Sequence, residues 1–208
     1  RCMIFALRRV VPLALPLLLL ACKPAAALPA AATTRPEPAA DAVAARPRTV
    51  IVVRHAEKAV DDPRDPSLSP AGAARARAIA ELLARAGVTH LFASEFKRTQ
   101  ATLRPLATAT GREIVVLPAA DRPALVAAIQ ALPAGSVAVV AGHSNTVPAL
   151  LIALGGEARE TLASPTGPQL PDDAYDRLYL LVLPARGAAQ TLELRQAPAA
   201  AAASARDQ

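Results

Sequence analysis

Aromatic residues are scarce in this sequence of 208 residues. They account for 2% of the chain, and tryptophan is absent. A hydrophobic core must therefore be assembled from Val, Leu, Ile and Ala. The hydrophobic fraction is nevertheless 53%, much of it alanine in the terminal segments. The length indicates one folded domain with tails.

Cysteine is almost absent as well. The two cysteines are Cys2 and Cys22, and both lie outside the part of the chain with a globular pattern. Their position excludes a disulfide framework and a metal site built from thiolates.

The excess of positive charge is too weak to predict a nucleic-acid partner. The formal net charge is +6. Residues 1–21 contain three arginines and no acidic residue, so the remainder carries 20 basic against 17 acidic residues. Because this excess is small and scattered, we expect no binding to nucleic acid.

The N-terminal apolar run is too short to span a membrane. Val10 to Leu20 is eleven residues long, whereas a transmembrane helix needs about 20. Arg8-Arg9 before the run and Ala21 after it are typical of a secretory signal. The ending Leu-Leu-Ala-Cys resembles a bacterial lipoprotein box, which implies acylation of Cys22 and a lipid anchor in the membrane. The alternative is an ordinary cleaved signal in which the cysteine is incidental.

Composition divides the chain into four segments. We expect a lipoprotein-type signal peptide at 1–21, an Ala/Pro-rich linker at 22–48, a folded domain at 49–196 and a disordered Ala-rich tail at 197–208. The signal predicts a location in the cell envelope, facing the periplasm. Lys23 after the cysteine favours the outer membrane.

Strand patterns alternate with helix patterns between residues 49 and 196. We expect strands at 49–53, 91–93, 113–117, 136–141, 177–183 and 191–194, and helices at 69–87, 95–110, 121–132 and 146–154. The alternation predicts an α/β fold with a mainly parallel sheet covered on both faces. In such folds ligands bind beyond the carboxyl ends of the strands.

Three segments with polar side chains follow strands of this sheet. They are Arg54-His55-Ala56-Glu57-Lys58, Ser94-Glu95-Phe96-Lys97-Arg98-Thr99 and Gly142-His143-Ser144-Asn145. The remaining histidine, His90, precedes a strand, so we expect it at an edge or on the surface. Taken singly, such arginines form surface ion pairs and such histidines cap helices. Together they form an ordered set at three strand ends, which favours a site.

The same segments resemble motifs of the histidine phosphatase (phosphoglycerate mutase-like) superfamily. Val52–Lys58 resembles its Arg-His-Gly/Ala motif, and Leu68–Gly72 its L-T/S-x-x-G helix start. Ser94–Thr102 resembles its S-x-x-x-R-T/A-x-x-T helix, and Gly142-His143 its second histidine. The resemblance spans about residues 49–155. It implies a three-layer α/β/α sandwich, and phosphoryl transfer without a metal or another cofactor.

The resemblance implies that His55 is the nucleophile and forms a phosphohistidine. Arg54 and Arg98 would bind the phosphate oxygens and lower the pKa of His55. His143 would donate a hydrogen bond to a phosphate oxygen in the transition state.

Substrate binding is assigned to Ser94 and Asn145. Backbone N–H groups of a helix start near Ser94 would contribute. We expect a small phosphorylated substrate and an open pocket. Its rims would be the loop 57–68, which contains Asp61, Asp62, Arg64 and Asp65, and the loop 156–175.

The proton donor for the leaving oxygen has no clear motif. Hydrolysis of an alkyl phosphate needs such an acid, and Ser144 stands where one branch of the family has an aspartate. Asp121 is one candidate, with capping of the next helix as the alternative. Glu57 is the other, with pairing to Lys58 or Arg98 as the alternative.

Three rival functions were weighed. Gly142–Thr146 resembles the nucleophile elbow of serine hydrolases, but its closing glycine is missing and no histidine follows Ser144. A metallohydrolase would need clustered ligands, whereas arginines beside the two histidines repel a cation. The third is a lipoprotein that binds a phosphorylated or anionic ligand without turnover, and it stays open as the alternative function.

Overall fold

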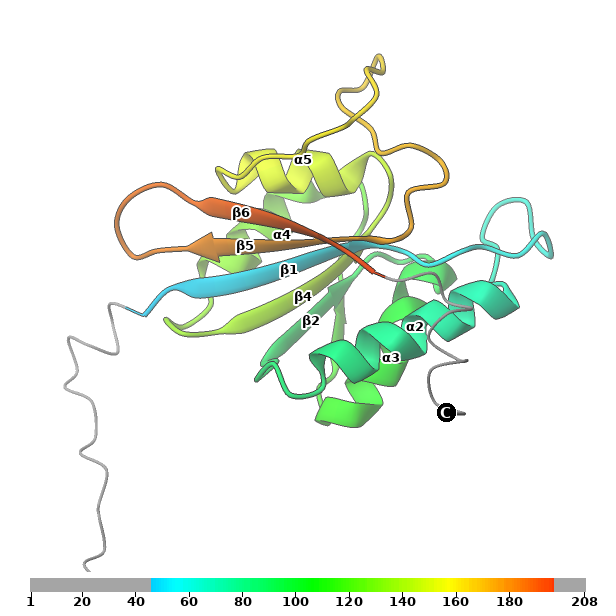
Figure 1. The fold of residues 1–208 in the computed structure, drawn as a ribbon, viewed down its shortest axis with the longest axis horizontal. Coiled ribbons are helices and arrows are strands. Elements are labelled where there is room, and N and C mark those ends of the chain that lie inside the picture. Colours follow the sequence, from blue (N-terminus) through cyan, green and yellow to red (C-terminus); the bar gives the residue numbers. More distant parts are fainter. Residues whose placement is uncertain (1–45, 197–208) are drawn as a thin grey trace, which may run out of the picture. The chain divides into compact units, whose positions relative to one another are not determined.

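Six strands form one sheet, and helices pack on both of its faces (Figure 1). The computed structural model describes residues 46–196. The strands are β1 (Arg48–Arg54), β2 (His90–Ala93), β3 (Ile114–Val116), β4 (Val137–Gly142), β5 (Arg177–Leu183) and β6 (Gln190–Arg195). The helices are α2 (Pro70–Leu83), α3 (Lys97–Thr110), α4 (Arg122–Gln130) and α5 (Thr146–Ala153). The predicted α/β fold is confirmed.

The sheet is mainly parallel, in the order β3-β2-β4-β1-β5-β6. The first four strands in sequence pair in parallel, and β5 and β6 add an antiparallel hairpin beside β1. The carboxyl ends of β1, β2 and β4 therefore meet at one edge, where β5 begins. Polar segments that follow those strands are brought together there.

The central strand β1 shows why the domain has three layers. Val50 and Val52 belong to a core cluster formed with α4 and α5. Ile51 and Val53 belong to a second cluster formed with α2 and α3. Successive side chains of a strand point to opposite faces, so a run that is apolar throughout needs a helical layer on each side. Figure 1 shows α2 and α3 on one side of the sheet and α5 on the other.

Local start and stop signals place the helices to within a few residues. Ser69 caps α2, since its Oγ accepts the N–H of Gly72 at 3.1 Å, and Pro70 occupies the first turn as expected. This helix ends at Leu83, earlier than the expected stop at Gly87, which lies in a following turn with φ +69°. Gly111 ends α3 in the left-handed conformation, as predicted.

The predicted signal peptide, most of the linker, Cys22 and the C-terminal tail lie outside the described residues. Their interpretation remains a prediction. None of the helices within residues 46–196 has the length and hydropathy needed to cross a membrane.

Candidate active site

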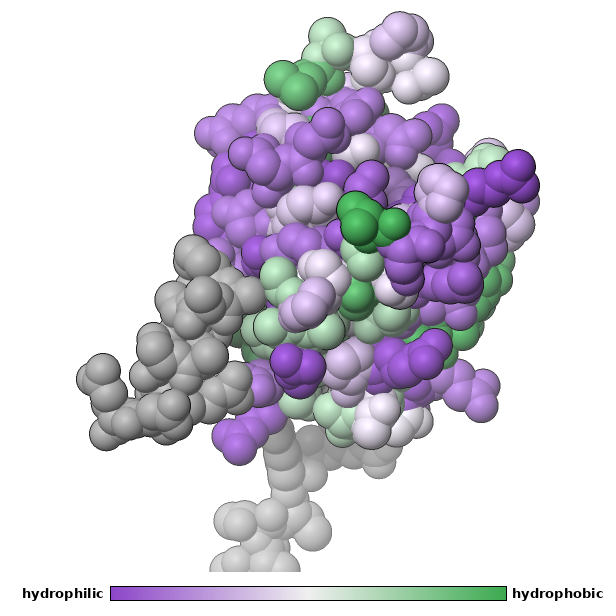
Figure 2. All heavy atoms as spheres, turned by 90° about the vertical axis from the view of Figure 1, so that its right-hand side faces the viewer, coloured by the Kyte–Doolittle hydropathy of each residue, from purple (hydrophilic) through white to green (hydrophobic). Residues whose placement is uncertain are grey.

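A cavity of about 540 Å³ lies beyond the carboxyl ends of β1 and β4. The residues around it include Arg54, His55, Arg98, His143, Asn145 and Asp172. Both loops expected as rims take part, through Lys58 and Arg64 of one loop and Asp172 of the other. Figure 2 looks onto this end of the molecule, whose surface is largely hydrophilic with scattered hydrophobic residues.

His55 is fixed by backbone contacts on both sides. Its N–H donates to the carbonyl of Gly142 at 2.8 Å, so it continues the pairing of β1 with β4. Its ring Nδ1 lies 2.8 Å from the carbonyl oxygen of Ala56. A carbonyl oxygen can only accept, so Nδ1 carries the proton of the neutral ring. The lone pair of His55 is then on Nε2.

The pKa of His55 is lowered from 6.5 to about 4. Burial is the largest cause, and His143, Arg54 and Arg98 add to it, while the hydrogen bond to Ala56 opposes the change. The pKa of His55 is therefore lowered, as predicted. Burial contributes more to this lowering than Arg54 and Arg98, which the sequence analysis gave as the cause. His55 is neutral at pH 7.

The next residue ties this segment to α3. The Ala56 N–H donates to Thr102 Oγ1 at 2.9 Å, and the Thr102 hydroxyl donates to the carbonyl of Arg98 at 2.7 Å. Thr102 is the last residue of the S-x-x-x-R-T/A-x-x-T pattern. It positions the His55 loop against the helix that carries Arg98.

Arg54 is held by the loop that precedes β5. Its Nη1 donates to the carbonyls of Pro171 at 2.8 Å and Asp172 at 3.0 Å. Its guanidinium carbon lies 4.2 Å from the centre of the Tyr175 ring, in a cation–π contact. The Nε–H of Arg54 is buried and has no hydrogen-bond partner.

Arg98 approaches the cavity from the first turn of α3. Its guanidinium lies 4.4 Å from the centre of the Phe96 ring and 3.6 Å from an Asp65 carboxylate oxygen. Its Nη1 is buried and makes no hydrogen bond. A buried donor without an acceptor costs about 1–3 kcal/mol. Arg54 and Arg98 both line the cavity, so two guanidinium groups place positive charge around a space that can accept an anion.

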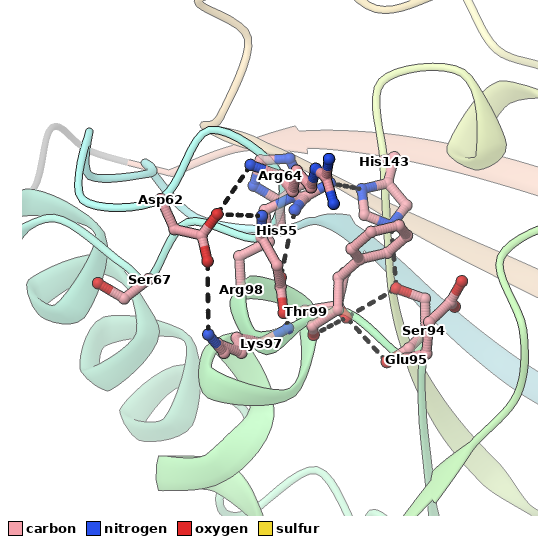
Figure 3. A network of polar contacts seen from close by, with 12 residues as sticks. His55, Asp62, Arg64, Ser67, Ser94, Glu95, Lys97, Arg98, Thr99 and His143 are labelled. Carbon is pink, nitrogen blue, oxygen red and sulfur yellow. Dashed lines mark hydrogen bonds and ion pairs between the residues drawn. The ribbon is translucent and has the colours of Figure 1, made fainter.

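His143 lies across from His55, with 5.3 Å between the ring centroids. Its Nε2 is 2.9 Å from Ser94 Oγ, which is 2.8 Å from Thr99 Oγ1 (Figure 3). Its Nδ1 faces Arg98 Nη2 at 3.5 Å. Burial first, then Arg98 and Arg54, lower the pKa of His143 to about 4. His143 is therefore also neutral at pH 7 while the cavity holds no anion.

Comparisons with known proteins agree with this geometry. Residues 50–121 match the family described as the histidine phosphatase superfamily (branch 1). A stretch of 75 residues is 37% identical to the probable phosphoglycerate mutase GpmB of Enterobacter sp. (strain 638). This match covers 33% of the present chain and only 35% of that protein. Over residues 50–121 the chain is similar to the histidine phosphatase superfamily.

Solved structures show the same histidine phosphatase fold. The protein histidine phosphatase SixA complexed with tungstate matches with a TM-score of 0.54 and 21% identity, over 71% of this chain and 96% of that one. A mycobacterial glucosyl-3-phosphoglycerate phosphatase matches with a TM-score of 0.51 and 16% identity, over 73% and 99%. At these identities the likeness is one of fold. The match to this family over residues 50–121 supports phosphatase or mutase-type chemistry in general.

Of the residues assigned to substrate binding, Asn145 lines the cavity and Ser94 does not. Ser94 is buried behind His143 and holds its ring. The expected helix start near Ser94 was wrong. The helix α3 begins at Lys97, because Thr99 Oγ1 donates to the carbonyls of Ser94 and Phe96 and keeps the intervening residues in a bend. The Lys97 N–H donates to Asp65 at 3.0 Å, so a carboxylate of the protein already occupies this helix start.

Both candidate proton donors, Glu57 and Asp121, make other interactions in the structure. Glu57 forms an ion pair with Arg75 at 2.7 Å, so neither expected partner, Lys58 nor Arg98, is the one found. Burial is the largest single influence on Glu57 and favours a higher pKa, but the hydrogen bonds and charge of Arg75, a backbone hydrogen bond and the charge of Arg54 together lower the pKa below its ordinary value. Asp121 accepts the N–H of Ala124 at 3.0 Å and caps α4. It lies outside the lining of the cavity, beside a separate small apolar pocket.

The sequence pattern missed three residues at the site. Asp172 is the one carboxylate-bearing residue among those of the described chain that line the cavity. Tyr175 stacks on Arg54, and Lys58 borders the cavity beside His55. Their loops were expected as rims, and Lys58 ends the motif segment Val52–Lys58, but the sequence assigned no role to any of the three residues. Within residues 46–196, no three His, Cys, Asp or Glu side chains gather in the way that a metal ion requires.

Proposed function

We propose that this protein is a phosphomonoester hydrolase that acts through a phosphohistidine on His55, without a metal. One observation carries the proposal. The ring of His55, whose Nε2 is unprotonated, lines one cavity together with the guanidinium-bearing residues Arg54 and Arg98 and with His143. Phosphoryl transfer depends mainly on positioning and on neutralising charge on the phosphate oxygens, and this arrangement supplies both.

In the first step, His55 Nε2 attacks phosphorus in line with the leaving oxygen. A P–N bond forms and the P–O bond to the leaving group breaks. The electron pair of that bond leaves with the oxygen, which takes up a proton. The ring becomes positively charged, and the Ala56 carbonyl that accepts from Nδ1 stabilises this charge. Water then attacks phosphorus, phosphate departs and His55 regains its lone pair.

His143 assists by gaining a proton when the phosphate enters. Thr99 donates to the Phe96 carbonyl at 2.8 Å, so its oxygen accepts from Ser94, and Ser94 in turn accepts from His143 Nε2. A phosphate dianion beside the ring favours the charged form. Nδ1 then donates to a phosphate oxygen while Nε2 keeps its bond to Ser94.

Asp172 is our proposed proton donor in place of Asp121 and Glu57. Asp172 lines the cavity, and its backbone carbonyl accepts from Arg54, which ties the loop position to the proposed phosphate site. The other two carboxylates are occupied by a helix cap and by Arg75.

The proposal is tested with p-nitrophenyl phosphate and the full chain in detergent. His55→Ala should abolish hydrolysis, whereas His90→Ala, which changes a histidine away from the cavity, should retain it. Activity should survive EDTA. Hydrolysis by the His55 variant would refute the mechanism, and a strict metal requirement would refute the metal-free chemistry.

Trapping separates an enzyme from a binding protein. Acid-labile radiolabel from a labelled phosphomonoester should appear on the wild-type chain and be absent from His55→Ala. A wild-type chain that binds phosphate, releases no product and takes up no label would instead be a non-catalytic ligand-binding lipoprotein.

We also propose that the protein is an exported lipoprotein, anchored through Cys22 and facing the periplasm. The support is the sequence of residues 1–22. Cys22→Ser should move the protein from the membrane fraction to the soluble fraction on cell fractionation, with Cys2→Ser as the control. A Cys22→Ser protein that stays in the membrane fraction would show that the anchor is not this cysteine.

A further inference from the structure

Two cations at the rim of the catalytic cavity have no counter-charge in the protein. Lys58 and Arg64 belong to the loop 57–68, and both line the cavity together with His55 and Arg98. Both residues are exposed. Within residues 46–196 no ion pair joins either of them to a carboxylate, and neither side chain donates a hydrogen bond to another group.

Arg54 is held by backbone carbonyls, and three other neighbouring cations have acidic partners. Arg75 pairs with Glu57 at 2.7 Å, Lys97 with Asp62 at 3.8 Å and Arg98 with Asp65 at 3.6 Å. Three acidic and three basic side chains near the site are thus paired with each other. Lys58 and Arg64 remain unpaired in a region that is rich in carboxylates.

Lys58 and Arg64 stay unpaired because the acidic side chains of the loop 57–68 bind other groups. Asp61 accepts from the backbone N–H and hydroxyl of Ser67. Asp62 accepts from the backbone of Arg64 and Asp65 and reaches Lys97 (Figure 3). These bonds, together with the bridge between Lys58 and Leu68, give the loop a defined shape. None of the acids of this loop is among the residues that line the cavity.

The size of the cavity leaves room beyond the transferred phosphoryl group. Its volume of about 540 Å³ is in the range of sites that enclose a whole small molecule. Arg54 and Arg98, which line the cavity with His55, are the residues assigned to the phosphoryl group. Lys58 and Arg64 are not needed to bind the phosphoryl group. Asp172 is the one residue with a negative side chain among the described residues that line the cavity.

We propose that Lys58 and Arg64 form a second anion subsite, and that the substrate carries a second anionic group, a phosphate or a carboxylate, besides the phosphoryl group that is transferred. This inference rests on the proposed function for its meaning, but the binding preference that it predicts does not depend on turnover. Exposed cations that face a cavity raise the local concentration of anions, and a guanidinium binds phosphate or carboxylate through two parallel hydrogen bonds.

The test measures equilibrium binding by calorimetry in a full-length His55→Ala background, so that no ligand is consumed. The probes are glucose 6-phosphate and glucose 1,6-bisphosphate at constant ionic strength. A hydrogen bond to a charged group contributes about 1.5–3 kcal/mol, so the bisphosphate should bind roughly tenfold or more tightly than the monophosphate. 6-Phosphogluconate replaces the second phosphate by a carboxylate and shows which of the two groups is preferred.

Variants locate the preference. Lys58→Gln with Arg64→Gln should reduce the ratio of the two affinities to near one. Arg77→Gln with Arg85→Gln removes the same charge from exposed positions at α2, away from the cavity lining, and should keep the ratio. Equal affinity for the two probes in the parent, or a preference that survives in Lys58→Gln/Arg64→Gln, would overturn the second subsite.

The outcome is distinct from that of the hydrolysis assay. Hydrolysis of p-nitrophenyl phosphate by the wild type, without a preference for the bisphosphate in the binding experiment, would retain the phosphatase and remove the subsite. A preference that depends on Lys58 and Arg64, in a chain that hydrolyses nothing, would retain the subsite and remove the phosphatase.

Discussion

The loop before β5 holds Arg54 and also carries Asp172, the proposed proton donor. The carbonyls of Pro171 and Asp172 hold the guanidinium of Arg54, and the Tyr175 ring covers its face. Asp172 is also one of the residues that line the cavity. The group that binds the phosphoryl oxygens and the proposed acid for the leaving oxygen are therefore fixed relative to each other by adjacent residues.

Asp172→Asn tests this assignment through the leaving group. An alkyl phosphate needs protonation of its oxygen, whereas p-nitrophenolate leaves readily without it. We expect kcat for glycerol 2-phosphate to fall by about 10²–10⁴-fold, and kcat for p-nitrophenyl phosphate by less than about tenfold. Steady-state kinetics with both substrates measure the difference.

The adjacent Asp173 provides the control. It is exposed and outside the cavity lining, so Asp173→Asn should show no such dependence on the leaving group. Equal losses on both substrates in Asp172→Asn would mean that this residue only positions Arg54.

At the scale of elements, the first turn of α2 supports the loop that follows His55. The Ser69 N–H donates to the Glu57 carbonyl at 2.9 Å, and Arg75 binds the Glu57 carboxylate one turn later. Gly72 lies between them. A Cβ at that position would be 2.1 Å from the Glu57 carbonyl oxygen. The glycine of the L-T/S-x-x-G pattern is thus required by the close approach of two backbones, two residues after His55.

Gly72→Ala should therefore harm both stability and catalysis. Backbone atoms of Glu57 must move to admit the methyl group, at a cost of about 1–3 kcal/mol. Thermal unfolding should show a lower Tm, and kcat for p-nitrophenyl phosphate should fall because His55 shifts with the loop. Ala71→Ser adds one atom at an exposed position of the same turn and should leave both nearly unchanged. A Gly72→Ala enzyme with wild-type Tm would contradict this close approach.

The elements that carry the motifs were predictable because their signals are local. Ser69-Pro70 and Gly111 mark helix ends within a few residues of sequence, and the apolar run of β1 marks a strand buried on both faces. The misplaced start of α3 also has a local cause, but it depends on which carbonyls the Thr99 hydroxyl reaches. The sequence pattern does not determine which carbonyl groups this hydroxyl binds.

The partners across long sequence separations were not predictable from patterns. Glu57 pairs with Arg75 and not with Lys58 or Arg98, because the close approach at Gly72 brings α2 against it. Asp172 reaches the cavity because its carbonyl meets Arg54, 118 residues earlier in the chain. Both contacts arise only when the sheet is complete. The residues that line the proposed phosphoryl site could be found from sequence motifs, whereas those around the proposed leaving group could not.

At the scale of the whole molecule, the site places two neutral histidines inside the protein beside two arginines. His55 and His143 are 4% and 9% exposed, and the pKa of each is lowered to about 4. In the unfolded chain both would titrate near 6.5. Between these values the unfolded state binds more protons than the folded state, so acid favours unfolding. The stability is complete above pH 6.5 and is lost as the pH falls toward 4.

Thermal unfolding of the wild type should therefore show a Tm that decreases steadily from pH 7 to pH 4. At about 1.4 kcal/mol per pKa unit, each histidine accounts for a loss on the order of 3 kcal/mol over this window, and less than twice that for the coupled pair. The variant His55→Gln/His143→Gln lacks both titrating groups and should lose much of the slope. His90→Gln removes the remaining histidine, which lies at the start of β2 away from the cavity, and should keep the wild-type slope. If the double variant and the wild type gave parallel curves, the acid sensitivity would lie in carboxylates such as Glu57. Burial of the two histidines would then contribute little to it, and their pKa values in the folded protein would have to lie closer to 6.5.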